Sequence, residues 1–389
     1  MEKKNAAKNL FLKTFNASPD LYSFAPGRIE FIGNHTDYNG GNVIGLAINE
    51  GVTMAFRRRD DDTINLISEN ESSVQSNLAN IHRLEKEDSW ANYPLGVTKV
   101  FQDAGHKINF GYDLAIDSDL PIRAGLSSSA ALELGLAVLL NHSFNLNLEK
   151  HELVQLCRKA ENEFVGVPCG ILDQGVSAFG QSGHLVKIDC MNQVFDLISF
   201  SKNQSDKYFW LLNTNKKHSL VDSLYIERFK ECQLALKLVQ NRFPEIQNLS
   251  QMGYNRLEMS KSELGDILYR RALHIISENQ RVEKLSRAIK KDNYEAVGKF
   301  MYESHESSRL NFENSTPELD FIIDYIKGNE SVFGARLTGG GFGGAVVVMA
   351  KSYLSRSLEN DLSLAYKKKF GIELSTLCTN SEDGARILN

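Results

Sequence analysis

The chain lacks three features that would each point to a specialised class of protein. It has no apolar stretch long enough to span a bilayer and no leader-like apolar run near its start. It has no basic excess, because 44 Lys and Arg face 49 Asp and Glu, for a formal net charge of -5. Its five cysteines are odd in number and show no C-x-x-C spacing. We therefore expect a cytoplasmic protein with no nucleic-acid, membrane or obligate protein partner.

The length of the chain favours two domains. With 389 residues, of which 42% are hydrophobic, it exceeds the size at which one core usually stops growing. A polar stretch at 201–207 follows a strand-like run at 185–188 and is the candidate junction. We expect an N-terminal domain over residues 1–203 and a helix-rich C-terminal domain over residues 204–389, because helical apolar spacing recurs there.

A first group of polar residues lies in the glycine-bounded segment 27–41, which reads Gly-Arg-Ile-Glu-Phe-Ile-Gly-Asn-His-Thr-Asp-Tyr-Asn-Gly-Gly. The surrounding residues 21–53 alternate short apolar runs with glycines, which predicts strands joined by tight turns. Side chains that both donate and accept hydrogen bonds suit a polyhydroxylated ligand. A solvated loop, in which Asp37 makes ordinary turn hydrogen bonds, accounts for this segment alone equally well.

A second segment, at 121–131, brings small residues to the start of an Ala- and Leu-rich run. This pattern predicts a loop that opens a helix, whose unpaired N–H groups bind phosphate. It matches neither the G-x-x-x-x-G-K-[ST] nor the G-x-G-x-x-G nucleotide motif. A helix simply capped by serine is an equally good account of the segment alone.

Two carboxylates stand in unusual surroundings. Asp173 lies between apolar residues in the segment 169–175, where a carboxylate needs a partner or a metal unless it caps the next helix. Glu161 falls beside the apolar stripe of a helix that follows Asn147 and ends near Gly166. A surface ion pair with a neighbouring Arg or Lys is the alternative for Glu161.

A last glycine run, Gly339, Gly340 and Gly341, precedes a strand-like stretch at 345–349 and could be only a flexible turn. Together and in this order, the segments are more specific than any one of them. The chain resembles the GHMP kinase superfamily and, within it, the galactokinases. Residues 27–41 are similar to the family's sugar signature, and 121–130 and 337–344 to its second and third motifs. Residues 168–174 and 213–225 look like galactokinase rather than mevalonate or homoserine kinase sequence, and the resemblance covers most of the chain.

The resemblance implies an α+β fold with two domains. The N-terminal domain would resemble ribosomal protein S5 domain 2, the C-terminal domain would be ferredoxin-like, and the active site would lie between them. The family binds ATP, Mg²⁺ and galactose, and makes galactose 1-phosphate and ADP.

The resemblance also implies a role for each matching residue. Asp173 would be the catalytic base, kept ionised by Arg28, and Ser129 with Glu161 would hold Mg²⁺. The sugar would be lined by Asn34, His35, Asp37, Gly170 and Tyr225, although Tyr225 also lies on an apolar helix stripe and would serve equally well as a core tyrosine. The ATP phosphates would be cradled by Ala124, Gly125, Leu126, Ser127, Ser128 and Ser129, with the glycine run 339–341 as the third motif.

Four residues depart from the family pattern: Glu30 replaces Asn, Asn34 replaces Glu, Gly45 replaces Pro and Arg123 replaces Gly. The first two differences look like an exchange, and we hypothesise that residues 30 and 34 restore each other's polar contacts. Because Asn34 removes a negative charge, a 1-kinase for a uronate or an amino sugar is an alternative to a galactose kinase. A non-catalytic galactokinase-like sugar sensor is another, although the retained Asp173, Arg28 and Glu161 argue against it.

Overall fold

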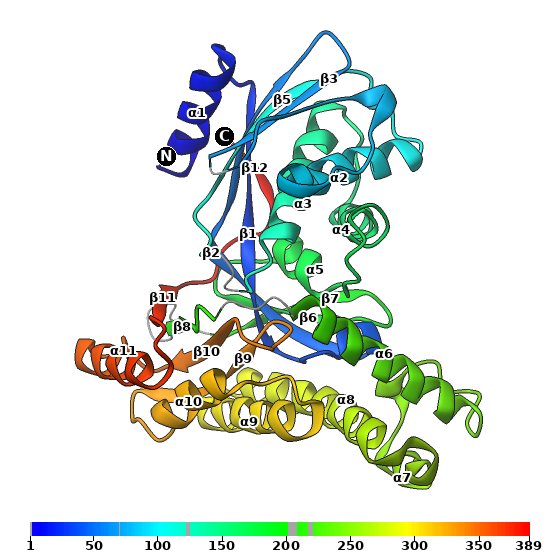
Figure 1. Cartoon of the computed structure of the whole chain (residues 1–389), viewed down its shortest axis with the longest axis vertical. Helices are drawn as coiled ribbons and strands as arrows, with labels where there is room; N and C mark the ends of the chain where they lie inside the picture. Colours follow the sequence, from blue (N-terminus) through cyan, green and yellow to red (C-terminus); the bar gives the residue numbers. More distant parts are fainter. Residues whose placement is uncertain (1, 70, 122–124, 201–207, 217–220) are drawn as a thin grey trace.

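The computed structural model describes residues 2–69, 71–121, 125–200, 208–216 and 221–389, and it contains two β-sheets flanked by helices (Figure 1). The expected α+β class is confirmed. The proposed boundary between residues 203 and 204 lies outside the described residues, as do Arg123 and Ala124.

The larger sheet runs in the order β12-β1-β2-β5-β3-β4, and a β6-β7 hairpin extends it from β2. Every neighbouring pair is antiparallel except β3 and β5. Its strands are β1 (Leu21–Ile32), β2 (Asn42–Arg58), β3 (Thr63–Ser68), β4 (Val74–Asn77), β5 (Tyr112–Ser118), β6 (His184–Asp189), β7 (Val194–Ser199) and β12 (Arg386–Leu388).

Helices cover both faces of this sheet. The helix α1 (Glu2–Phe15) packs on β2 and β5, whereas α2 (Asn92–Asp103), α3 (Ser128–Ser143), α4 (Lys150–Lys159) and α5 (Leu172–Phe179) lie on the opposite face (Figure 1). On β2, Ala55 faces the α1 side while Met54 and Phe56 enter the main core, as the two-residue period of a strand requires. Because α3 is apolar on nearly every side, it is buried in that core.

The smaller sheet is antiparallel, in the order β11-β8-β10-β9, and its strands are β8 (Tyr208–Asn213), β9 (Val332–Thr338), β10 (Ala345–Ala350) and β11 (Ser375–Thr379). One face packs on α10 (Pro317–Ile326) and α11 (Arg356–Phe370), while the other joins the main core through Phe209 and Val347. The remaining helices, on the lower side of Figure 1, are α6 (Val221–Gln240), α7 (Tyr254–Met259), α8 (Lys261–Lys290) and α9 (Tyr294–Ser307).

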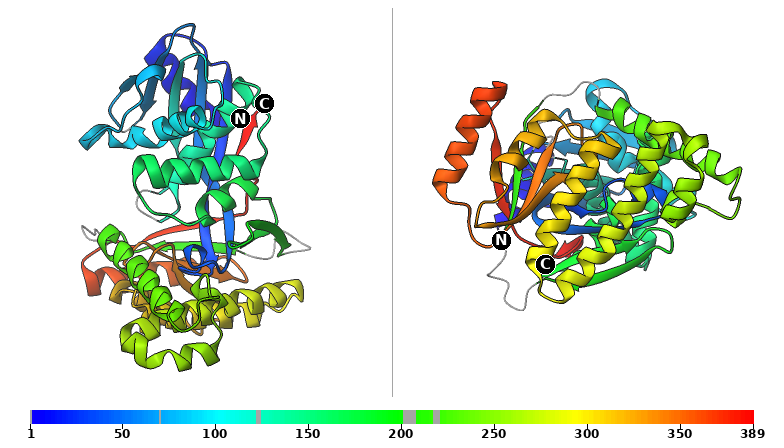
Figure 2. Two further views of the ribbon diagram at one scale, coloured as in Figure 1. Left: turned by 90° about the vertical axis from the view of Figure 1, so that its right-hand side faces the viewer. Right: turned by 90° about the horizontal axis from the view of Figure 1, so that it is seen from below.

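The chain does not divide into two sheets built from contiguous halves. After the second sheet is complete, β12 returns to pair with β1, with Tyr22 opposite Leu388. Both ends of the chain therefore lie near each other beside the first sheet (Figure 2).

Two irregularities in β1 set the direction of the polar residues that follow. The pairing with β2 shifts register between Pro26 and Arg28 and again between Glu30 and Ile32. Such bulges re-aim side chains and often border functional sites. The glycine at position 45, opposite Glu30 on β2, leaves room for Val176, because an added Cβ would lie 2.4 Å from that side chain.

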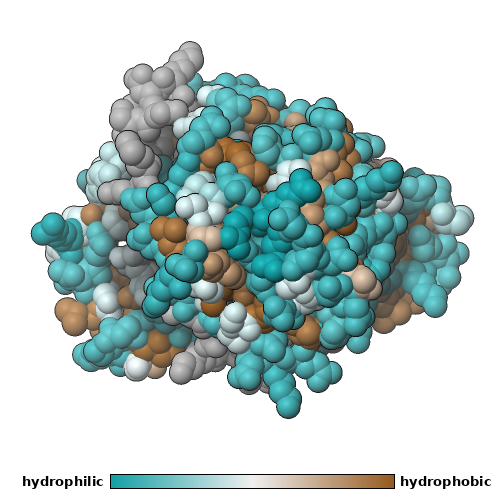
Figure 3. All heavy atoms as spheres, turned by 90° about the horizontal axis from the view of Figure 1, so that it is seen from above, coloured by the Kyte–Doolittle hydropathy of each residue, from teal (hydrophilic) through white to brown (hydrophobic). Residues whose placement is uncertain are grey.

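The surface view in Figure 3 is mostly hydrophilic, with apolar residues scattered among polar ones. In the described part of the chain, no helix is both long and apolar enough to cross a membrane.

Candidate active site

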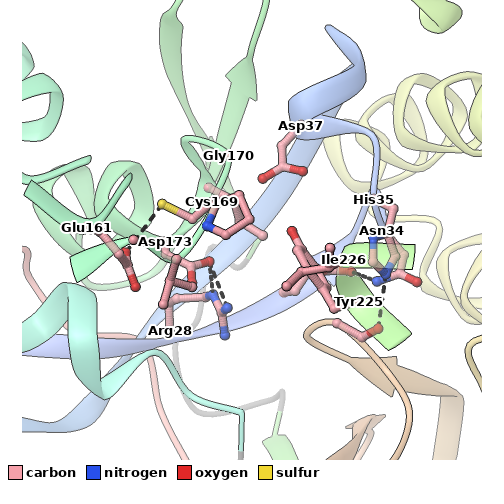
Figure 4. A pocket seen from close by; sticks show the side chains of 16 residues that line it. Arg28, Asn34, His35, Asp37, Glu161, Cys169, Gly170, Asp173, Tyr225 and Ile226 are labelled. Atoms are coloured by element: carbon pink, nitrogen blue, oxygen red, sulfur yellow. Dashed lines mark hydrogen bonds and ion pairs between the residues drawn. The ribbon is translucent and has the colours of Figure 1, made fainter. Parts of the chain in front are cut away.

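A cavity of ≈ 450 Å³ opens where β1, the loop after it, α5 and α6 meet (Figure 4). Eight residues of the predicted sugar, catalytic and metal sites line it, and Gly340 borders it from the glycine run. The sequence segments that were each ambiguous alone therefore converge on one place. The lining residues are Arg28, Glu30, Asn34, His35, Asp37, Glu161, Gly166, Val167, Pro168, Cys169, Gly170, Leu172, Asp173, Tyr225, Ile226 and Gly340.

Asp173 and Arg28 form an ion pair at the wall of this cavity. The Nε and Nη2 atoms of Arg28 lie 2.8 and 2.7 Å from Oδ1 of Asp173, and the hydroxyl of Ser127 donates to Oδ2. Arg28 also donates from Nη1 to the carbonyl of Gly125, at 2.6 Å. Both oxygens of Asp173 are thus oriented, and the arginine ties the carboxylate to the glycine and serine loop.

The second carboxylate, Glu161, belongs to a buried acidic cluster. Gln174 donates from Nε2 to Glu161 at 2.6 Å and to Glu133 at 3.0 Å, and the thiol of Cys169 donates to Glu161 at 3.3 Å. Burial raises the pKa of Glu161, and the nearby charge of Asp173 raises it further. Burial likewise raises the pKa of Glu133, whose Oε1 has no hydrogen-bond partner among the described residues.

The Glu161 position arises from an interruption of the helix. Straight after α4, a π-helical turn covers Ala160–Val165 and ends at Gly166, where φ is 84°. The predicted end of the helix is confirmed. Pi-helical turns often occur at functional sites, because the extra residue re-aims the side chains of that turn.

Asp37 provides a third carboxylate on the far side of the cavity, opposite Asp173 (Figure 4). Burial raises the pKa of Asp37 to about 7. Its Oδ2 lies against Gly170, which has no side chain to displace it. The carboxylate therefore borders the cavity at a place where sugar hydroxyls can reach it.

Both ring nitrogens of His35, which lines the cavity, are engaged by neighbouring protein groups. Its Nδ1 lies 2.8 Å from the hydroxyl of Tyr38, and its Nε2 lies 3.0 Å from the carbonyl of Gly340. Burial lowers the pKa of His35 to about 3, so the ring is neutral. The carbonyl can only accept, so Nε2 carries the proton and Nδ1 accepts from Tyr38. Tyr225 lies beside this ring, with 5.1 Å between the ring centroids, and lines the cavity.

The hypothesis that residues 30 and 34 restore each other's contacts is confirmed. Asn34 donates from Nδ2 to Oε1 of Glu30 at 2.9 Å. Arg336, on β9, also approaches Oε1 of Glu30, with Nη2 at 3.1 Å, and it has no exposed surface. The exchanged pair is thus joined across the two sheets.

The predicted phosphate loop adjoins the cavity without lining it. Ser127 adopts a left-handed conformation with φ of 53°, and α3 begins at the next residue, with Ser128 exposed and Ser129 partly exposed. Leu126 is buried and anchors the loop, and its carbonyl accepts a hydrogen bond from the backbone of Arg28. A Cβ on Gly339 would lie 3.4 Å from the carbonyl of Gly125, so the two glycine loops face each other. Gly341 packs against Asn314.

Sequence reasoning missed Glu133 and Gln174 as parts of the site. The signal for Glu133 was a single charged residue in an otherwise apolar helix, and Gln174 follows Asp173 directly. It also missed Arg336, whose contact with Glu30 spans 306 residues of sequence and has no local signature.

Comparisons with known proteins place this site in a family. Residues 92–181 match the description "GHMP kinases N terminal domain", and residues 285–367 match "GHMP kinases C terminal". The fold and the site therefore define a GHMP kinase. Residues 9–58 match the "Galactokinase galactose-binding signature", which covers β1 and the loop with Asp37.

Individual relatives narrow the class. The chain is 38% identical to a galactokinase of Thermotoga neapolitana over 93% of this chain and 98% of that protein. It is 37% identical to a galactokinase of Clostridium beijerinckii, over 99% of each chain. The crystal structure of Lactococcus lactis galactokinase complexed with galactose superposes with a TM-score of 0.94 at 33% identity, covering 99% of this chain and 100% of that one. The chain belongs to the galactokinase family.

Proposed function

We propose that this protein transfers the γ-phosphoryl group of ATP to the anomeric hydroxyl of D-galactose, giving galactose 1-phosphate and ADP. The observation that carries the proposal is the Arg28 and Asp173 ion pair, which joins the wall of the cavity to the glycine and serine loop. In phosphoryl transfer, catalysis comes mostly from positioning and charge stabilisation. The Arg28 and Asp173 ion pair contributes to both.

Asp173 acts as the base. Its oriented carboxylate accepts the proton of the anomeric hydroxyl while the sugar oxygen bonds to the γ-phosphorus. The bond from that phosphorus to the bridging oxygen breaks, and the electron pair leaves with ADP. Arg28 lies within 2.8 Å of the carboxylate and contributes positive charge near the transferring group.

The other cavity residues hold the sugar. Asp37 accepts hydrogen bonds from galactose hydroxyls, and Gly170 leaves space for the Asp37 carboxylate beside it. Tyr225 and the neutral ring of His35 provide an aromatic wall for the C–H faces of the sugar. The lining of the cavity holds four acidic side chains, Glu30, Asp37, Glu161 and Asp173, and one cation, Arg28, so an anionic uronate is disfavoured.

The loop Gly125–Ser129 takes the ATP phosphates. The first N–H groups of the 16-residue helix α3 have no partners inside the helix, and they carry the positive end of its dipole. Gly339 and Gly340 close the opposite side, where the absence of side chains leaves room for a nucleotide. Ala124 is proposed to extend this loop on the basis of the resemblance alone.

Glu161 and Ser129 fit a magnesium ion. Glu161 is buried beside Asp173 and forms no ion pair with a cation in the described part of the chain, and Ser129 supplies a second hard oxygen donor. Within the described ranges, no group of three acidic, histidine or cysteine side chains could hold a metal. A site with two protein ligands matches an ion that also binds phosphates. When bound, the ion would neutralise charge on the phosphates. We place the protein in the cytoplasm, in keeping with its five free cysteines.

An ADP-release assay over a panel of monosaccharides, with phosphorus NMR of the product, tests the proposal. We expect turnover with D-galactose, a 1-phosphate product, and loss of activity when divalent metal is chelated. Phosphate at C6, or no turnover of galactose while a uronate or amino sugar reacts, would overturn it.

A further inference from the structure

The exchange of residues 30 and 34 moves a carboxylate from the loop after β1 to the strand itself. The resemblance assigned the sugar contact to position 34. In this chain the residue there is an amide, Asn34 (Figure 4), and it borders the same cavity as Glu30. Which of the two side chains has free hydrogen-bonding capacity decides which one can contact the substrate.

The side chain of Asn34 has no free hydrogen-bonding capacity. Its two amide hydrogens are directed at Oε1 of Glu30, at 2.9 Å, and at the carbonyl of Gly339, at 2.8 Å. Its Oδ1 accepts from Asn314 at 2.7 Å and from Ser308 at 3.3 Å. An amide offers two donors and two lone pairs, so all four positions are occupied. Asn34 also has no exposed surface.

Asn34 is fixed through its backbone as well. Its N–H points at Oε1 of Glu278, at 3.3 Å, and its carbonyl lies 3.0 Å from Nε2 of His274. Both partners lie on α8, a helix that packs against the loop after β1. The side chain cannot turn toward a ligand without breaking contacts that join the two parts of the molecule.

Glu30 is in the opposite situation. Its Oε1 receives both Asn34 and Arg336, whereas its Oε2 accepts no hydrogen bond from the described residues. The side chain is 7% exposed and lines the cavity. Arg336 and Arg28 both lower the pKa of Glu30 against the larger effect of burial, which raises it. Oε2 of Glu30 is therefore a fixed acceptor to which no group among the described residues donates a hydrogen bond.

We propose that Oε2 of Glu30 accepts a hydrogen bond from one hydroxyl of galactose, and that Asn34 is a positioning residue that holds Glu30 in place. The specificity role assigned to position 34 therefore lies at position 30 in this chain. This inference rests on the proposed galactose substrate.

The test measures galactose binding by calorimetry, without ATP, for the wild type and Glu30→Gln. In the variant, Arg336 and Asn34 keep the carbonyl oxygen at the Oε1 position, so the NH₂ group replaces the free acceptor. The 2-, 3-, 4- and 6-deoxygalactoses are compared with galactose. We expect the wild type to lose about tenfold or more in affinity for one of them, since a hydrogen bond to a charged group contributes roughly 1.5–3 kcal/mol. Glu30→Gln should shrink that one difference, because its NH₂ group can make only a neutral hydrogen bond to the hydroxyl oxygen, and should leave the other three.

Glu50→Gln is the matched control, because Glu50 is also a buried carboxylate, but it is hydrogen-bonded to Thr379 and Asn49 and does not line the cavity. It should keep the wild-type pattern of deoxygalactose affinities. If Glu30→Gln does not fold, Glu30→Asp keeps the charge for Arg336 and withdraws the free oxygen, and should shrink the same single difference.

The experiment distinguishes a wrong substrate from a wrong role for Glu30. If the wild type does not bind galactose, the proposed substrate is wrong. If it binds galactose and a folded Glu30 variant keeps all four wild-type differences, the role of Glu30 is refuted.

Discussion

A Cβ atom on Gly170 would lie 1.7 Å from Oδ2 of Asp37, so the carboxylate occupies the space that any side chain at position 170 would take. Gly170 is not in the left-handed region, and alanine fits its backbone. We expect Gly170→Ala to displace Asp37 and weaken galactose binding by roughly tenfold or more, with little loss of stability. Calorimetry measures the effect. Gly253→Ala is the control, because nothing lies within 4 Å of its added Cβ. Unchanged affinity in Gly170→Ala would separate Asp37 from the sugar.

Asp173→Asn tests the base. The amide keeps an oxygen for Arg28 but cannot take a proton, so turnover should fall on the order of 10² to 10⁴ while galactose still binds. Steady-state kinetics and a binding measurement separate the two effects. Asp196→Asn, on the exposed side of β7, should behave like the wild type. A folded Asp173→Asn enzyme with normal turnover contradicts the assignment.

Sugar binding should release a proton near neutral pH. The pKa of Asp37 is raised to about 7, whereas hydrogen bonds from hydroxyls favour the ionised carboxylate and lower that pKa in the complex. Below about pH 7, galactose must therefore displace a proton, and affinity should fall by up to roughly tenfold for each further pH unit. Calorimetry in buffers of different ionisation heat, at about pH 6 and about pH 9, counts the proton. Release at the higher pH alone, or at neither, would contradict this account.

Gln174→Leu should destabilise the protein in a pH-dependent way. Gln174 donates to both Glu133 and Glu161, and its loss leaves buried acceptors unpaired at about 1–3 kcal/mol each. Folding already raises the pKa of both carboxyls, so the part of the penalty that comes from their charge is absent while they stay protonated and grows as the pH rises through their folded-state pKa. Urea unfolding should show a larger defect at about pH 8 than at about pH 5.

Gln155→Leu is the control for that variant, because Gln193 is the hydrogen-bond partner of the Gln155 side chain among the described residues. The double variant Gln174→Leu with Glu133→Leu should recover part of the lost stability, since it removes one of the stranded charges. Equal stability of Gln174→Leu and the wild type at both pH values would show that the amide does not support the acidic cluster.

Local sequence patterns were sufficient for most elements. The Ala- and Leu-rich run after the serine loop is α3, the helical spacing expected in the C-terminal domain includes α6, and the apolar run at 345–349 is β10. These predictions depend on neighbours a few residues apart, where periodicity and glycine carry the information. The contact between residues 30 and 34 was predictable for the same reason.

Long-range contacts were not predictable in this way. The motif around Asn34 indicated a sugar-facing residue, but its side chain is hydrogen-bonded to Gly339, Asn314 and Ser308. Those partners lie about 270 to 305 positions away, beyond the reach of any periodic pattern. The same limit applies to Arg336 and to the pairing of β12 with β1.

The return of β12 has a consequence for biosynthesis. One edge of β1 pairs with β2, but on its other edge the residues Tyr22, Ser23 and Phe24 meet their strand partners only in residues 386–388. On the ribosome, that edge stays open while the whole second sheet is being made. An open edge strand recruits other strands, so the unfinished chain is exposed to aggregation for longer than a domain completed in one stretch.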